Sequence, residues 1–106
     1  MGEANLLKRT RELLEEPLLG QEGVDEKVYR LLEGEYLRRL ARYHRVNSAL
    51  RQKYGMAFED FAAKRVAREK GYSWDVESDA MDWETAVGGI RMLERKVREL
   101  REARGI

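Results

Sequence analysis

The most informative stretch of this chain is residues 72–84, which read YSWDVESDAMDWE. It holds both tryptophans of the protein and five acidic residues, and it contains no basic residue. The Ser73 hydroxyl is placed to accept a hydrogen bond from a first-turn backbone N–H, and Asp75 suits the positive end of a helix dipole. The stretch therefore predicts the beginning of a long helix at Ser73.

This helix is predicted to run over residues 73–104 because apolar residues continue at a seven-residue spacing. The repeat consists of Val76, Trp83, Ile90 and Val97. Such a heptad spacing is typical of helices that pack lengthwise against another helix. The pair Gly88-Gly89 interrupts the pattern, and it indicates either a close helix approach or a kink.

A second long helix is predicted over residues 25–54 by the same spacing. Its repeat consists of Tyr29, Tyr36, Tyr43 and Leu50. These residues, together with Trp83, Ile90 and Val97 of the later helix, are the expected packing set, in a core or in a dimer interface. Asn47 falls within this stripe, where it either fixes the register by pairing with a like residue or faces outward. Gly55 is expected to end the helix.

Shorter elements complete an all-α chain. A helix is predicted over residues 57–70 and ended by Gly71, and another over 5–16, capped by Asn5 or a neighbour and ended before Pro17. Leu18 and Leu19, in the linker that ends at residue 23, either hold the first helix in place or make residues 5–23 a mobile binding arm. We expect a single helical domain over residues 1–106, arranged as an elongated helical hairpin or bundle.

The composition bounds the classes of function. The chain has 106 residues, 39% of them charged, with a net charge of +1 and no cysteine. So many charges leave a narrow apolar stripe on each helix, which favours completion of the core by a second copy. The missing thiols, and the missing apolar run of a membrane span or signal peptide, favour a cytoplasmic location away from the membrane.

Acidic and basic residues form two rows of equal spacing. The acidic row consists of Asp75, Asp79 and Asp82, and the basic row of Arg38, Arg42 and Arg45. The rows either pair with each other, or the arginines contact phosphates, although the low net charge makes nucleic acid an unfavoured partner for this chain alone. A carboxylate metal site would need ligands from further helices, so we expect no metal and no cofactor.

Catalytic motifs are missing from the sequence. It contains neither of the glycine-rich phosphate loops, and its serines lack the setting of a nucleophile elbow. The single histidine, His44, has no cysteine partner and no second histidine at ligand spacing, so a packed side chain is favoured over a ligand. We expect a protein that is not an enzyme.

Two segments resemble a known group of proteins. Residues 54–61, YGMAFEDF, resemble the YGM-S/T-FEEF segment of small helical antitoxins from prokaryotic toxin–antitoxin modules. Residues 71–80, GYSWDVESDA, with Trp83-Glu84, resemble the acidic continuation of the same group, so that the similarity covers roughly residues 50–100. Ala57 departs from the pattern, because the Ser or Thr hydroxyl that would cap the next helix is lost.

The resemblance implies a non-catalytic protein that binds and masks a cognate toxin. Trp74 points away from Trp83 and lies beside the acidic row, so Trp74, Asp75, Asp79 and Asp82 are the expected partner-binding residues. Buried tryptophan anchors and complementary charge suit a tight interface with a basic cleft. The alternatives are a structural homodimer with Trp83 and the tyrosines in the interface and, less favoured, an RNA-binding helical hairpin.

Overall fold

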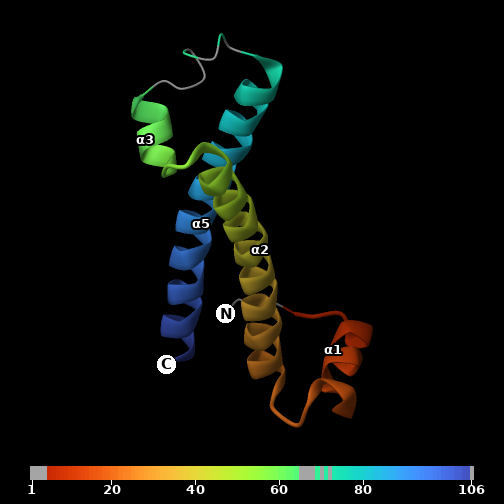
Figure 1. Cartoon of the computed structure of the whole chain (residues 1–106). Helices are drawn as coiled ribbons and strands as arrows, with labels where there is room; N and C mark the ends of the chain where they lie inside the picture. The colour runs from red at the N-terminus through yellow and green to blue at the C-terminus, as the bar shows by residue number, and fades with distance from the viewer. Residues whose placement is uncertain (1–4, 65–68, 70, 72, 106) are drawn as a thin grey trace. The chain divides into compact units, whose positions relative to one another are not determined.

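The chain is all-α in the computed structural model, which describes residues 5–64, 69, 71 and 73–105. In chain order the elements are α1 (Lys8–Glu15), the 3-10 helix η1 (Pro17–Leu19), α2 (Val24–Tyr54), α3 (Phe58–Ala63) and α5 (Trp74–Arg104) (Figure 1). None of the described residues forms a strand. The all-α class and the two long helices predicted from the heptad spacing are confirmed.

The chain separates into two compact units, Met1–Glu35 and Tyr36–Ile106, with the boundary inside α2. The second unit is a helical hairpin. Its pairs of contacting residues run in opposite order along the two helices: Tyr54 contacts Asp79, Asn47 contacts Trp83, and Tyr43 contacts Gly89. The part of α2 in this unit therefore packs antiparallel to α5, as the ribbons in Figure 1 also show.

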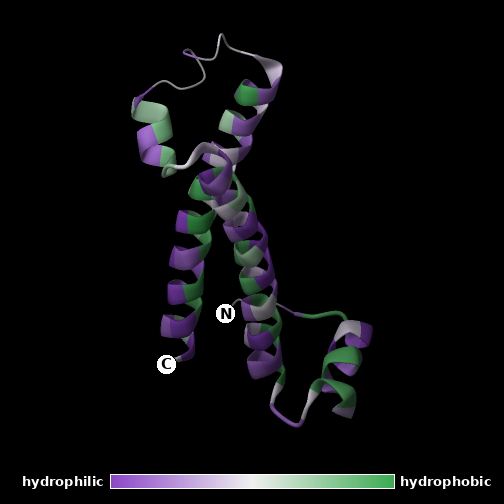
Figure 2. Cartoon of the chain, in the orientation of Figure 1, coloured by the Kyte–Doolittle hydropathy of each residue, from purple (hydrophilic) through white to green (hydrophobic). Residues whose placement is uncertain are grey.

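The core of the hairpin is built around Trp83, whose side chain is fully buried. Three aromatic rings surround its indole: the ring centroids of Phe61, Phe58 and Tyr54 lie 4.9, 5.6 and 5.8 Å from that of Trp83. The other buried apolar residues of the unit are Leu50, Phe61, Val76, Ala86, Leu93, Val97 and Leu100. Figure 2 shows hydrophobic residues gathered along one side of α5 and hydrophilic residues along the other.

The predicted packing residues lie in this core or at its edge. Leu50, Trp83 and Val97 are buried, and Tyr36, Tyr43 and Ile90 are half-buried. The hypothesis of a dimer interface through Trp83 is wrong, because Trp83 is already enclosed by residues of its own chain. Tyr29, the remaining member of the set, belongs to the first unit and is half-buried there.

The two adjacent glycines have different surroundings. A Cβ on Gly89 would lie 2.4 Å from Cε2 of Tyr43, whereas a Cβ on Gly88 would have no atom within 4 Å. The helix continues through both positions. Gly89 therefore permits a close approach of the Tyr43 ring of α2, which favours the first of the two alternatives for this glycine pair.

The helix ends follow the predicted chemistry in the second unit. The Val76 amide donates to Ser73 Oγ at 3.4 Å, as expected for the cap of α5. Gly55 ends α2 with a φ of 68°, and Ala57 precedes α3 without a side-chain cap. The helix predicted over 57–70 ends at Ala63 with Lys64 in a turn, and residues 65–68 and 70 lie outside the described residues.

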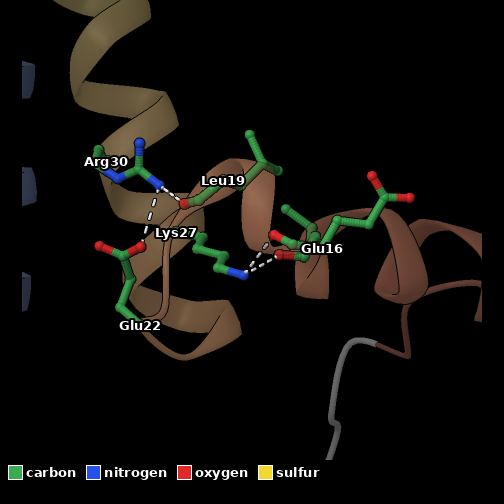
Figure 3. A network of polar contacts seen from close by, with 6 residues as sticks. Glu16, Leu19, Glu22, Lys27 and Arg30 are labelled. Atoms are coloured by element: carbon green, nitrogen blue, oxygen red, sulfur yellow. Dashed lines mark hydrogen bonds and ion pairs between the residues drawn. The ribbon is translucent and has the colours of Figure 1, made fainter.

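In the first unit, polar contacts hold the short helices. The Lys27 ammonium, buried to 2% exposure, donates to the carbonyl oxygens of Leu14 and Glu16 at the end of α1 (Figure 3). Arg30 likewise contacts the Leu19 carbonyl oxygen at the end of η1. Cations are favourable at these positions because the last carbonyls of a helix have no partner within it.

Two expectations for this unit are wrong. The first helix begins at Lys8 instead of residue 5, and its cap position, Leu7, supplies no side-chain hydrogen bond. Leu18 does not hold the helix in place, because its side chain is 89% exposed. Of the two alternatives for the linker leucines, apolar attachment therefore fails for Leu18, whereas Leu19 is half-buried. The contacts that attach the short helices are those of Lys27 and Arg30 to backbone carbonyls.

Candidate functional site

The side of α5 opposite the core carries an uncharged stripe, which we call the outer stripe. It consists of Trp74, Ser78, Met81, Thr85, Gly88 and Met92. Steps of four and three residues place all six on one side of the helix. Three large side chains of the stripe are exposed to solvent: Trp74 by 80%, Met81 by 69% and Met92 by 44%. Apolar side chains that gather on one exposed face mark a surface for interaction.

Charges of opposite sign border the two halves of the outer stripe. Exposed carboxylates border its N-terminal half, Asp75 and Asp82 on one edge and Glu77 and Glu84 on the other. Exposed cations border its C-terminal half, Lys96 on the first edge and Arg91 and Arg95 on the second. The stripe thus has an acidic end near Trp74 and a basic end beyond Met92.

Asp79 lies away from this stripe and is engaged within the hairpin. Its Oδ2 accepts hydrogen bonds from Lys53 Nζ and from the Tyr54 hydroxyl, each at 2.6 Å. The Lys53 and Tyr54 hydrogen bonds hold the pKa of the Asp79 carboxyl below its usual range. Burial, and then the Asp79 carboxylate, raise the pKa of Tyr54 to about 12. Asp79 therefore clasps the end of α2 to the start of α5.

Because of this clasp, only two of the three aspartates of the acidic row are exposed to solvent. Of its three members, Asp75 and Asp82 are exposed, and Asp79 keeps only 20% of its side-chain surface exposed. The hypothesis that the row pairs with the arginines is wrong for Asp79, whose partners are Lys53 and Tyr54. Arg42 and Arg45 lie exposed on α2.

A pocket lies near the turn between α2 and α3. This pocket of about 260 Å³ has apolar walls from Phe58, Val87 and Ile90. His44 reaches its rim as an exposed side chain, in contrast to the packed side chain that was expected. Across the pocket, Arg91 forms an ion pair with Glu59 at 3.2 Å. The pocket is therefore a surface depression bridged by an ion pair. Its lining residues do not have the arrangement of a nucleophile beside a general base that a catalytic site requires.

The described residues contain no group of three or more His, Cys, Asp or Glu side chains that could hold a metal ion. Within the same part of the chain, every helix is too short or too polar to cross a membrane.

The exposed partner-binding residues predicted from the sequence lie at only one end of the outer stripe. Trp74, Asp75 and Asp82 were expected at a partner surface, whereas Met81, Thr85 and Met92 were not singled out. The sequence does carry a pattern for the whole stripe, because an uncharged residue recurs at alternating spacings of four and three from residue 74 to residue 92. The apolar repeat of the core face is a stronger pattern than this one, and it predicts packing on the opposite side of the helix.

The chain was compared with known proteins. No protein-family model, curated protein or solved structure matches it.

Proposed function

We propose that this chain is a non-catalytic protein-binding module that acts in the cytoplasm through the acidic end of the outer stripe. The observation that carries the proposal is the position of Trp74, 80% exposed at the first turn of α5 and beside the exposed carboxylates of Asp75 and Asp82. An indole that is 80% exposed makes few contacts that stabilise the fold, so its contacts are available to a partner.

The chemistry of this end favours a basic partner. Tryptophan is among the residues that contribute most to binding when a partner buries it, and charge complementarity guides the encounter. Four carboxylates border the acidic end, namely Asp75, Glu77, Asp82 and Glu84. A toxin with a basic active-site cleft, as the antitoxin-like segments imply, has the matching charge. Masking that cleft would be the activity of this chain.

Co-expression with the neighbouring open reading frame tests the proposal. We expect the two products to copurify and this chain to suppress the toxicity of its neighbour. Trp74→Ala combined with Asp82→Arg should weaken copurification at least tenfold, because the indole anchor is lost and one charge is reversed. Asp79 is left unchanged in this variant, since its loss would loosen the hairpin itself.

A matched control is available on α3. Asp60→Arg reverses the charge of an exposed carboxylate that lies off the outer stripe, and it should leave copurification unchanged. The proposal fails if the neighbouring product is harmless and the chain purifies alone, or if the control weakens the pair as much as the double variant.

A structural homodimer is the second candidate, and it is favoured by a specific observation. Five of the six residues of the outer stripe remain exposed after the hairpin has formed, with Met81 69% and Met92 44% exposed. A coiled-coil-like pairing of two copies would cover these side chains. Such a dimer uses the outer face of α5 instead of the Trp83 face first expected.

A further inference from the structure

We infer that the outer stripe of α5 is a self-complementary surface on which a second copy of this chain binds in antiparallel orientation. The inference names a partner for the same face as the proposed function, and it rests on that proposal only in the choice of face. Its support is the distribution of exposed apolar residues and of charge along one helix.

The stripe has the length and composition of a helix-pairing face. It spans residues 74–92, which is about 28 Å of helix at 1.5 Å per residue. No charged residue occurs at its positions, and its middle consists of Thr85 and Gly88. A Cβ on Gly88 would meet nothing within 4 Å, so the surface there is open to another molecule. Small residues at a crossing point let two helices approach closely.

The bordering charges select the orientation. In an antiparallel pair related by a two-fold axis, each edge of one stripe meets the same edge of the other. With the axis between Thr85 and Gly88, Glu77 lies opposite Arg95 of the second copy, and Glu84 lies opposite its Arg91. On the other edge, Asp75 and Asp82 flank the position of Lys96 of the second copy. Every acidic edge therefore meets a basic one.

A parallel pair has the opposite result. In that case opposite edges of the two stripes meet at the same height along the helices, so that Glu77 would face Asp75 and Asp82 of the second copy and Arg95 would face its Lys96. Like charges at facing positions of paired helices are unfavourable. In the antiparallel register the two exposed methionines also match, because Met81 lies opposite Met92 of the second copy.

The cations of the basic end are accessible to a second copy although each already has a partner within the chain. Arg91 pairs with Glu59 at 3.2 Å, Arg95 with Glu99 at 3.8 Å, and Lys96 with Glu99 at 3.3 Å. These side chains are about half or more exposed, and exposed ion pairs exchange partners at little cost. The carboxylates of a second copy can therefore join them. A protein that binds at Trp74 would compete with the second copy for the acidic end.

The first test is the oligomeric state of the full chain alone. Sedimentation equilibrium at low ionic strength should show a reversible dimer at micromolar concentration, and added salt should weaken it because the border charges are exposed. Glu77→Lys with Glu84→Lys should weaken dimerisation at least tenfold while the circular dichroism of the helices is kept. The control, Asp60→Lys with Glu69→Lys, makes the same change in net charge at exposed positions off the stripe and should dimerise as the unaltered chain does.

The second test determines the orientation by disulfide trapping, which the cysteine-free sequence allows. Met81→Cys and Met92→Cys chains are mixed and oxidised at low concentration. The antiparallel register predicts that the main product joins one Met81→Cys chain to one Met92→Cys chain. A parallel pair predicts disulfides between two copies of the same variant. A monomer at every concentration, or products from parallel pairing, would overturn the inference. Neither result bears on copurification with a toxin, so the proposed function stands or falls separately.

Discussion

One side-chain hydrogen bond explains why a polar residue occupies the apolar stripe of α2. The indole Nε1–H of Trp83 donates to Oδ1 of Asn47 at 2.8 Å. Trp83 is fully buried, and a buried N–H without an acceptor costs free energy. Asn47 supplies that acceptor at one position along the hairpin, so it satisfies the core and favours a single register of α2 against α5.

Replacing this acceptor should destabilise the hairpin through the indole. Asn47→Leu leaves the Trp83 N–H unsatisfied, which is expected to lower the free energy of unfolding by about 1–3 kcal/mol. In a Trp83→Phe background, where the donor is gone, the same change should cost clearly less. Urea unfolding of the four proteins gives the coupling energy. Equal costs in both backgrounds would mean that the hydrogen bond contributes nothing.

Gly88 and Gly89 provide a matched pair of substitutions with opposite expected signs. Gly89→Ala forces a Cβ toward the Tyr43 ring, to within 2.4 Å of Cε2 if nothing moves, and should destabilise by about 1–3 kcal/mol. Gly88→Ala meets open space and should stabilise by about 1 kcal/mol through helix propensity. Urea midpoints at one protein concentration test both. A stabilising Gly89→Ala would contradict the close approach of the two helices.

At the scale of elements, the Asp79 clasp should make the hairpin sensitive to pH at both extremes. The pKa of Asp79 is lower in the folded chain, so its contribution is present above the unfolded pKa of about 3.9 and is lost as the pH falls through the folded value. The pKa of Tyr54 is raised to about 12 from 10.0. Its contribution is therefore complete below pH 10 and is lost as the pH rises toward 12.

Two variants separate these effects in unfolding measured across pH. Asp79→Asn should remove the acid-side loss and reduce the alkaline one, because burial of Tyr54 remains. Tyr54→Phe should remove the alkaline loss attributable to the phenol. The exposed Asp60→Asn is the control and should follow the unaltered chain. If Asp79→Asn matches that control at low pH, the clasp does not contribute to stability.

The attachment of α1 is also tested at the scale of elements, through Lys27, whose side chain contacts the end of that helix. Lys27→Met keeps the length of the side chain and removes the ammonium that binds the Leu14 and Glu16 carbonyls. We expect residues 8–15 to lose amide protection in hydrogen exchange, while residues 74–104 keep theirs. Lys64→Met, an exposed position, should change neither. Unaltered protection of α1 in Lys27→Met would show that other contacts hold it.

The sequence allowed the helices to be predicted but only part of their contacts. The repeats through Tyr43 and Val97 indicated two long helices, and Ser73 and Gly55 marked ends, since these signals are local in the chain. The partners of Asp79 and Asn47 depend on the register between α2 and α5, which no local pattern specifies. The outer stripe could not be predicted for a different reason. Thr, Ser and Gly are common on solvent-facing sides of helices, so the stripe is informative only once the core face is known.

At the scale of the whole molecule, the two units differ in how much apolar surface they bury. Among described residues 5–35, Lys27 is the only one classed as buried, whereas the second unit buries eight hydrophobic residues. Polar contacts to carbonyls hold the first unit, and such bonds add about 1 kcal/mol each because water competes for them. An aromatic core holds the second. The stability of the chain is therefore concentrated in residues 36–105.

This uneven burial predicts that the chain loses structure in two steps. With rising urea, amides of α1 and of α2 before residue 36 should exchange at lower concentrations than those around Trp83, since local opening follows the number of buried apolar contacts. Trp83 emission, which reports the aromatic core, should change only in the second step, and Trp74→Phe removes the signal of the exposed indole. Hydrogen exchange at graded urea measures both steps in one protein. Coincident loss of protection in residues 8–30 and 76–100 would show a single cooperative unit instead, in which the first unit draws its stability from the hairpin core.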